Sequence, residues 1–250
     1  MPEGGLHSTE EWRAIGRGPD LLYEIVSWPE KRGRWTEDDF YAMGRSDWED
    51  FRRHWVHFWP AIGGVCVEVG CGVGRITRAL AEDFDHVIAL DVAQEMLTRA
   101  GKVVPANVEL RQVDGTNIPA ADASADGVFS VHVLQHLDNL ARVGEYLNEM
   151  RRVLKPGGTL MVHVNLVGHT RLSLGRWARV RHEMARIRNL RAIRRGRPSS
   201  YVTTRFYPVE EVWPLLSNIG FVDIELRLFS VRSNGYPHSF WFARRPVEAS

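Results

Sequence analysis

The feature that most constrains the fold is a glycine-rich turn between an apolar strand pattern and a helical pattern. Residues 67–75 read Val-Glu-Val-Gly-Cys-Gly-Val-Gly-Arg, and Asp91 closes the next apolar run, residues 86–90. A β-branched segment that breaks into alternating glycines lets the backbone approach a nucleotide closely, and a carboxylate about twenty residues further on can accept hydrogen bonds from ribose hydroxyls. The sequence therefore predicts an α/β sheet with a site for an adenosine-containing cofactor.

The spacing of the glycines argues against a dinucleotide. The dinucleotide fingerprint has glycines at its first, third and sixth positions. Counted from Gly70, the sixth position is Arg75, and the third glycine is Gly74. Close helix–strand packing around a pyrophosphate is therefore not encoded, and a nicotinamide-dependent oxidoreductase becomes the weaker alternative.

Four further motifs follow the glycine turn in a fixed order. They are Asp-Gly-Thr at 114–116, Asp-Gly-Val-Phe-Ser at 126–130, Leu-Gln-His-Leu at 134–137 and Leu-Lys-Pro-Gly-Gly-Thr-Leu at 154–160. Together with the glycine turn, they resemble the class I S-adenosylmethionine-dependent methyltransferases over roughly residues 62–245. The resemblance implies a Rossmann-like α/β fold with a seven-stranded, mostly parallel sheet, helices on both faces and an antiparallel last strand. It also implies S-adenosyl-L-methionine as the cofactor.

Strand and helix patterns alternate along this region. Strands are predicted at 65–69, 86–90, 107–113, 127–131, 158–164, 221–229 and 239–244, and helices at 73–83, 93–101, 138–154 and from Pro208 to Gly220. Such alternation predicts a parallel sheet with right-handed crossovers.

Two segments stand apart from this methyltransferase-like domain, which we place at 61–250. Residues 1–60 are predicted to form a helical cap: residues 46–49 have capping-box form, and aromatic residues recur at helical spacing from Trp48 to Trp59. Residues 166–205 are predicted to form a basic lid, because ten arginines between 171 and 197 face one acid, Glu183. A solvated arginine face, or a binding site for an anionic partner, is the alternative for this segment.

The resemblance assigns the cofactor contacts to loops that follow the strands. The implied cofactor set is Glu68, Gly70, Cys71, Gly72, Gly74, Asp91, Val92, Met96, Asp114, Gly115, Thr116, Val131 and Arg45. In this set Asp91 accepts from the ribose hydroxyls, Asp114 from the adenine amino group, and Glu68 supports the amino group of the cofactor. Arg45 is expected to reach the cofactor carboxylate with its fork of donors. A turn or helix-cap role is the alternative for both aspartates.

His132 and His136 are the candidate catalytic residues. Methyl transfer from a sulfonium mainly needs a positioned nucleophile and removal of its proton, and imidazole titrates near neutrality. The resemblance places residues after the fourth strand near the transferred methyl group, with a histidine at the position of His136 as base in some small-molecule and sugar O-methyltransferases. We therefore expect methyl transfer to a hydroxyl of a natural product or saccharide, with His136 as the base. A nitrogen or carbon acceptor, and a helix-capping role for these histidines, are the alternatives.

The remaining expectations concern metals, the acceptor and location. No metal ligand is assigned, because His163, Asn165 and His169 lack tight ligand spacing. The alternative, implied by the resemblance to a minority of sugar methyltransferases, is a divalent-metal site that these residues form near Asp126 or Asp138. Nucleic acid is not expected as the acceptor, since residues 130–133 read Ser-Val-His-Val where methyltransferases of base amino groups carry Asn/Asp-Pro-Pro-aromatic. The small-molecule acceptor, which can be acidic, is expected to contact aromatic residues of the cap: Trp35, Phe40, Tyr41 and Trp48. Without a signal-like segment or a membrane-spanning apolar run, we expect a cytoplasmic protein.

Overall fold

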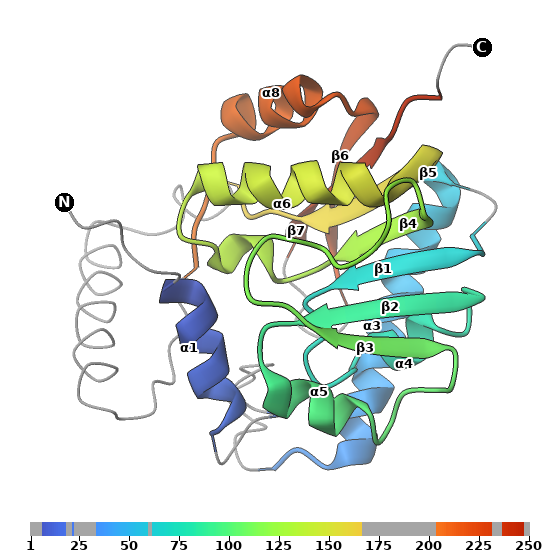
Figure 1. Ribbon diagram of the computed structural model, residues 1–250, viewed down its shortest axis with the longest axis vertical. Coiled ribbons are helices and arrows are strands. Elements are labelled where there is room, and N and C mark those ends of the chain that lie inside the picture. Colours follow the sequence, from blue (N-terminus) through green and yellow to red (C-terminus); the bar gives the residue numbers. More distant parts are fainter. Residues whose placement is uncertain are drawn as a thin grey trace.

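A seven-stranded sheet forms the centre of the protein. The computed structural model describes residues 7–18, 22, 34–59, 62–166, 204–231 and 237–247. The strands are β1 (Val65–Val69), β2 (His86–Asp91), β3 (Val108–Gln112), β4 (Ala125–Ser130), β5 (Leu154–His163), β6 (Val222–Ser230) and β7 (Pro237–Arg244). Their order in the sheet is β3-β2-β1-β4-β5-β7-β6 (Figure 1). The first five strands pair in parallel, while β7 is antiparallel to both β5 and β6, as the sequence predicts.

Helices cover both faces of this sheet. They are α1 (His7–Gly16), α3 (Glu37–Phe58), α4 (Thr77–Leu80), α5 (Gln94–Ala100), the 3-10 turn η2 (Leu134–His136), α6 (Leu140–Val153) and α8 (Val209–Ile219). In Figure 1, α6 lies in front of the strands and α3 behind them. The helix predicted at 73–83 is shorter than expected, because turns flank α4 on both sides.

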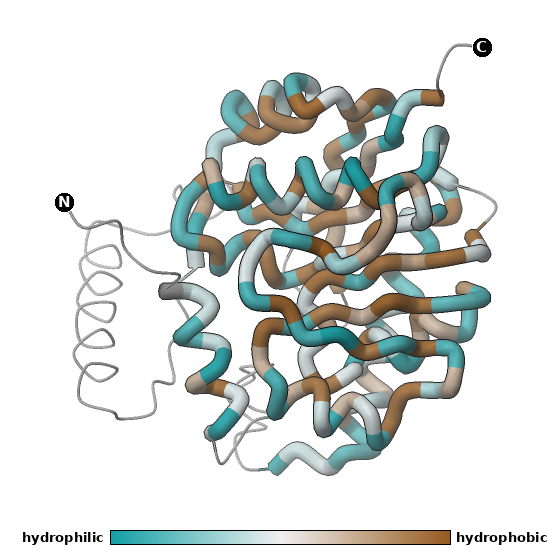
Figure 2. Tube along the Cα trace, viewed as in Figure 1, coloured by the Kyte–Doolittle hydropathy of each residue, from teal (hydrophilic) through white to brown (hydrophobic). Residues whose placement is uncertain are grey.

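The front layer follows the predicted apolar stripe of α6. The helix begins at Asn139, whose side chain accepts from the Arg142 amide at 2.9 Å and so satisfies one unpaired donor of the first turn. Val143, Leu147 and Met150 are buried in one cluster with the sheet and with α8. In Figure 2 the strands are mostly brown and the outer side of α6 is teal, which is the pattern of a helix with one buried face.

The rear layer corrects one prediction. Helix α3 begins at Glu37 with Thr36 as its N-cap, which accepts from the Asp39 amide at 3.1 Å, so the capping box expected at residues 46–49 is wrong. Acidic side chains at 37–39 favour that earlier start, because they face the positive end of the helix dipole. Four aromatic side chains of α3 are buried against β4, β5 and β7: Trp48, Phe51, Trp55 and Phe58. The aromatic face expected at helical spacing is therefore present, and it covers the sheet as part of the core.

Chain direction brings the functional loops to one edge. Parallel strands deliver their carboxyl ends to the same edge of a sheet, and a strand of opposite direction begins there. The loops after β1, β2, β3, β4 and β5 and the first residues of β7 therefore meet at that edge.

Two further expectations concern the basic segment and the membrane. Most of the predicted basic lid, residues 167–203, lies outside the described residues, although its flanking residues Leu166 and Tyr207 pair in a parallel bridge. Among the described helices, none combines the length and the apolar character that a bilayer crossing requires.

Candidate active site

The glycine turn after β1 connects two neighbouring loops. Gly70, Gly72 and Gly74 have φ values of +82°, +55° and +81°, in the left-handed region that favours glycine. The amides of Gly70 and Cys71 both donate to the carbonyl of Leu90, at 2.8 and 2.9 Å. A Cβ atom on Gly70 would lie 2.1 Å from Val133 Cγ2, so this glycine lets the loop after β4 pack against the turn.

Gly72 differs from Gly70 in what surrounds it. The described atom nearest to a Cβ built on Gly72 is Met96 Sδ, at 3.9 Å. Protein packing therefore does not require glycine here, and the space beside the backbone is available to a ligand.

Asp91 holds the glycine turn in place from the end of β2. Its Oδ2 accepts from the Gly72 amide and its Oδ1 from the Ala93 amide, both at 2.9 Å, and the side chain is buried. Burial raises the pKa of Asp91, and the backbone donors of Ala93 and Gly72 oppose that rise. A carboxylate oxygen can accept more than one hydrogen bond. The structural role and the expected contact with ribose are thus compatible.

Glu68 is a buried carboxylate beside the Thr77 hydroxyl, and one of its oxygens remains unpaired. It lies within β1, fully covered, and its Oε2 atom has no hydrogen-bond partner among the described residues. Burial raises the pKa of Glu68 to about 7. A buried acceptor without a donor costs free energy, and the ammonium of an amino-acid moiety would supply that donor. Glu68 and the open side of Gly72 therefore fit the amino-acid and ribose parts of S-adenosylmethionine.

The other expected cofactor residues follow β1, β2, β3 and β4. Cys71, Met96 and Val131 are buried, and the Val92 carbonyl accepts from Arg13 and Gln112, each at 3.1 Å. After β3, the side chain of Asp114 is exposed, Thr116 is half-buried, and the Gly115 carbonyl accepts from the Tyr146 hydroxyl at 2.9 Å.

Arg45 does not join these residues. Its guanidinium forms an exposed ion pair with Glu82, which follows α4, the helix that leads away from the glycine turn. The expectation that Arg45 reaches the cofactor carboxylate therefore has no support in the geometry. The fork of donors is already occupied by a carboxylate of the protein itself.

Helix α1 contributes contacts that the sequence did not indicate. Arg13 Nε donates to the Val92 carbonyl after β2, and the Trp12 ring lies 5.2 Å from the His136 ring after β4. Ile15 is buried in one cluster with Ala93 and Met96. The helix thus spans the loops on both sides of the glycine turn. Its only signal in the sequence is the spacing of Trp12 and Ile15 on one helical face.

The aromatic residues expected near the acceptor pack into the protein instead. Phe40 and Trp48 are fully buried, Phe40 in the cluster of α1 and the glycine turn and Trp48 against Phe129. The Tyr41 hydroxyl donates to the Val73 carbonyl at 3.1 Å.

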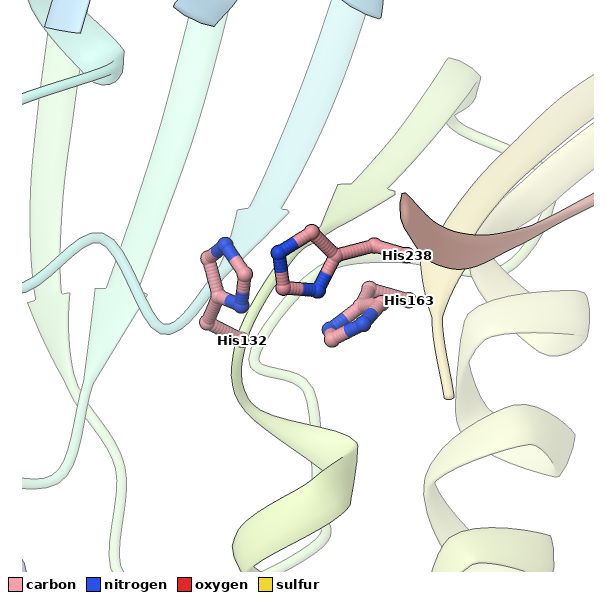
Figure 3. A group of neighbouring side chains, drawn as sticks. All are labelled: His132, His163 and His238. Atoms are coloured by element: carbon pink, nitrogen blue, oxygen red, sulfur yellow. The ribbon is translucent and has the colours of Figure 1, made fainter. Parts of the chain in front are cut away.

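The two candidate histidines take different positions. His136 closes η2, with its Nε2 atom 2.9 Å from Nε2 of Gln135. An amide nitrogen donates, so in this arrangement Nε2 of a neutral His136 accepts and Nδ1 carries the proton. His132 has a φ of +61°, which is uncommon for a residue with a side chain, and its ring faces His163 and His238 (Figure 3).

These three histidines form a cluster that we call the histidine triad: His132, His163 and His238. Each offers a ring nitrogen, and the three nitrogens all lie within 4.8 Å of one another. The sequence analysis considered His163 but missed His238. A signal was present, because an antiparallel last strand must begin at the edge where β5 ends.

A buried ion pair adjoins the triad. Arg75 Nη1 lies 2.6 Å from Asp47 Oδ2, and both side chains are buried. Burial lowers the pKa of His132 well below its ordinary range, with smaller contributions from His163, His238 and Arg75. Burial also lowers the pKa of His238, and the Asp47 carboxylate opposes that change. The pair therefore places one cation and one anion within electrostatic reach of the triad.

Comparisons with known proteins agree with this geometry. A family model described as a methyltransferase domain matches residues 67–162. The biotin biosynthesis bifunctional protein BioHC of Cellvibrio japonicus is 41% identical over 92 residues, which are 37% of this chain and 18% of that protein. The malonyl-[acyl-carrier protein] O-methyltransferase of Pectobacterium atrosepticum is 35% identical over 102 residues, which are 40% of this chain and 39% of that protein. The chain thus spans less than half the length of these curated relatives.

Among solved structures, the DhpI–SAH complex has a TM-score of 0.59 at 19% identity, and the match covers 96% of this chain and 98% of that chain. At that identity the likeness shows the fold alone. The fold and the glycine turn define a Rossmann-like protein with a site for an adenosine-containing cofactor. With the domain that matches at residues 67–162, they identify the fold as that of the class I S-adenosylmethionine-dependent methyltransferases, a class whose cofactor is S-adenosyl-L-methionine.

Proposed function

We propose that this protein transfers a methyl group from S-adenosylmethionine to a hydroxyl of a small molecule, a natural product or a saccharide, with His136 as the general base. The observation that carries the proposal is the place of His136. His136 ends η2, which follows β4 after a short loop. Val133 of that loop packs against Gly70 of the glycine turn. A base at that point is next to the loops that hold the cofactor.

The cofactor residues have separate tasks in this proposal. Asp91 accepts from the ribose hydroxyls while it keeps the Gly72 amide in place, and Asp114 accepts from the adenine amino group. Glu68 receives the ammonium of the amino-acid moiety, which supplies the donor that its Oε2 atom lacks. When bound, S-adenosylmethionine supplies a methyl group on a sulfonium that leaves readily. The protein then has to position the acceptor and remove its proton.

His136 suits proton removal better than His132. Burial and the neighbouring histidines hold the pKa of His132 well below its ordinary range, so its protonated form is disfavoured. His136 lies outside the triad and is half-buried, in contact with Gln135 and Trp12. To take a proton on Nε2, the His136 ring has to release the Gln135 amide.

An oxygen acceptor has support from two sides. One curated relative is by its name an O-methyltransferase. The loop after β4 reads Ser-Val-His-Val, without the Asn/Asp-Pro-Pro-aromatic sequence of enzymes that methylate amino groups of nucleic-acid bases. Two free buried cysteines accord with a reducing compartment, so the proposal includes a cytoplasmic location.

The test combines identification of the acceptor with a matched pair of variants. Methyl-labelled S-adenosylmethionine is incubated with the protein and a fractionated cell extract, and the labelled product is identified by mass. His136→Gln is then compared with His57→Gln, which changes an exposed histidine of α3. We expect His136→Gln to lower turnover by about 10²–10⁴-fold at unchanged cofactor affinity, and His57→Gln to leave turnover as it is.

The pH profile separates a base from a structural residue. The wild-type rate should rise through one ionisation near neutrality, and that limb should be missing in His136→Gln. A fall in turnover smaller than about tenfold, with the limb retained, would assign His136 to helix capping instead. A labelled product that carries the methyl group on nitrogen or carbon would overturn the hydroxyl acceptor while leaving the cofactor assignment intact.

A further inference from the structure

The histidine triad is assembled from three strands that are neighbours only in the folded protein. His132 follows β4, His163 ends β5, and His238 lies at the start of β7. Strands β4, β5 and β7 are adjacent in the sheet, and β7 runs in the opposite direction, so the three residues share one edge. The register pairs His163 with Phe240, which places His238 beyond the end of β5.

The rings lie close together without stacking. Ring centroids are 4.7 Å apart for His132 and His163, 5.1 Å for His163 and His238, and 5.2 Å for His132 and His238. Planes of the three pairs meet at 70–78°, and Figure 3 shows the rings turned toward one another. One nitrogen of each ring lies within 4.8 Å of the corresponding nitrogens of the other two rings, so the three nitrogens face one shared space.

Two observations indicate that this space serves a ligand. His163 is completely buried, and neither of its ring nitrogens forms a hydrogen bond of good geometry with a described residue, the Asn165 side chain being the nearest hydrogen-bonding group. Buried polar atoms almost always have a partner, and leaving one unpaired destabilises the folded protein. His132 also adopts the left-handed conformation, which folded proteins retain where the surroundings require it, often at functional sites.

We propose that His132, His163 and His238 bind one divalent transition-metal ion of the zinc, cobalt or iron(II) type. Three imidazole nitrogens are ligands that such ions prefer, whereas calcium and magnesium require oxygen ligands. Tetrahedral zinc with bonds of about 2.0–2.1 Å brings ligand nitrogens to about 3.3 Å from one another. Binding therefore requires the ring nitrogens to approach one another by about 1.5 Å, and His132 and His238 are less tightly enclosed than the fully buried His163.

The surroundings support binding of a cation. Imidazole ligates metals in its neutral form, and no described acid forms an ion pair with His132 or His163 that would hold either ring protonated. Arg75 is the nearby opposing charge, and Asp47 neutralises it at 2.6 Å.

Three protein ligands leave a coordination position open, as in catalytic rather than structural zinc sites. This part of the inference rests on the proposed function: an ion held by the triad would offer its open position to the acceptor hydroxyl and would lower the pKa of that hydroxyl. The hydroxyl proton passes to His136, the oxygen lone pair forms the bond to the methyl carbon, and the carbon–sulfur bond breaks with its electron pair on sulfur. Net oxidation state and atom count are unchanged.

The experiment measures metal binding without cofactor or acceptor. Chelator-treated full-length protein is titrated with Co²⁺, followed by visible d–d absorption, and then with Zn²⁺ in competition. We expect one bound ion per chain for the wild type and for His57→Gln. His238→Gln should bind the ion at least hundredfold more weakly, and this variant is chosen because His238 is only half-buried. His163→Gln should behave in the same way, and circular dichroism checks that each variant is folded. Thermal denaturation with and without Zn²⁺ gives a second reading, because a ligand of the native state stabilises it.

The outcomes separate this inference from the proposed function. Absence of tight Co²⁺ and Zn²⁺ binding, or equal affinity in His238→Gln and His57→Gln, overturns the metal site. If chelated His238→Gln still methylates a hydroxyl with full dependence on His136, the metal inference fails and the proposed function stands. If the wild type binds one ion through the triad but transfers no methyl group to any hydroxyl, the site stands and the proposed function fails.

Discussion

The two halves of the candidate active site differ in how completely the protein satisfies its own polar groups. The cofactor half consists of the loops after β1 and β2. There, the Asp91 carboxylate and the Leu90 carbonyl accept hydrogen bonds from the backbone amides of these loops. In the triad half, after β4 and β5 and before β7, both ring nitrogens of His163 lack a described partner. The first half is preformed by its own hydrogen bonds, whereas the second holds buried ring nitrogens that its own hydrogen bonds do not satisfy.

This difference shows which half depends on packing and which on a ligand. Glu68 Oε2 and Thr77 Oγ1 are the exceptions within the cofactor half, because neither buried atom has a partner among the described residues. The ion pair of Arg75 and Asp47 connects the halves: Arg75 follows the glycine turn, and the charge of Asp47 acts on His238. Substitutions at these points test the comparison.

The largest effect is expected from Asp47→Asn, which leaves the Arg75 guanidinium buried without its counter-charge. Breaking a buried pair by removing one partner costs about 3–5 kcal/mol, and the free energy of unfolding, from urea denaturation, measures that cost. Glu82→Gln is the matched control, because it breaks an exposed pair with Arg45 and should cost less than about 1 kcal/mol. Similar losses of unfolding free energy in both variants would show that the buried Arg75–Asp47 pair contributes no more to stability than an exposed pair.

The next effect separates packing from ligand approach within the glycine turn. Gly70→Ala forces a Cβ atom to within 2.1 Å of Val133 Cγ2 in the left-handed region, and we expect a loss of about 2–5 kcal/mol in unfolding free energy. Gly72→Ala meets no described atom closer than 3.9 Å, so only the backbone cost of about 1–2 kcal/mol applies.

Among variants that fold, Gly72→Ala should weaken cofactor binding more than Gly70→Ala does, which reverses the order expected for the loss of stability. Calorimetry with S-adenosylmethionine should find at least tenfold weaker binding to Gly72→Ala, because the methyl group fills the space beside the turn. Wild-type affinity in that variant would mean that the open side of Gly72 is not the cofactor site.

The strand–turn–helix–strand unit of the cofactor half could be predicted because its signals are local, whereas its contacts with a cofactor stay predictions. The glycines and Asp91 lie within one strand–turn–helix–strand unit, where spacing alone fixes their relation. The triad could not be found in that way, because His238 joins His132 and His163 only through the placement of β7 in the sheet. Asp47 was assigned to a capping box for a similar reason: its partner Arg75 comes from another element, and the local pattern competed with the true N-cap, Thr36.

A smaller effect concerns Glu68 and pH. Burial raises the pKa of Glu68 from 4.5 to about 7, so the unfolded chain loses this proton at lower pH than the native protein does. The contribution to stability is therefore complete below pH 4.5 and is lost as the pH rises through about 7, a change of about 3 kcal/mol. Glu68→Gln should lack this loss, so urea denaturation at pH 5 and pH 8 should give a steeper decline for the wild type. Parallel declines would show that Glu68 already has a partner in solution.

The smallest effect is expected from Arg45→Ala, which tests the one cofactor residue that the geometry places elsewhere. The guanidinium and its partner Glu82 are about half exposed, at 51% and 53%, and exposed pairs contribute about 0–1 kcal/mol because water and salt screen them. Because the Arg45 side chain points to the end of α4 and not to the glycine turn, the affinity for S-adenosylmethionine should change less than twofold in calorimetry. Glu82→Gln, which frees the guanidinium without removing it, is the control. If Arg45→Ala weakens cofactor binding tenfold while Glu82→Gln leaves it intact, Arg45 reaches the cofactor carboxylate after all, and the cofactor half extends onto α3.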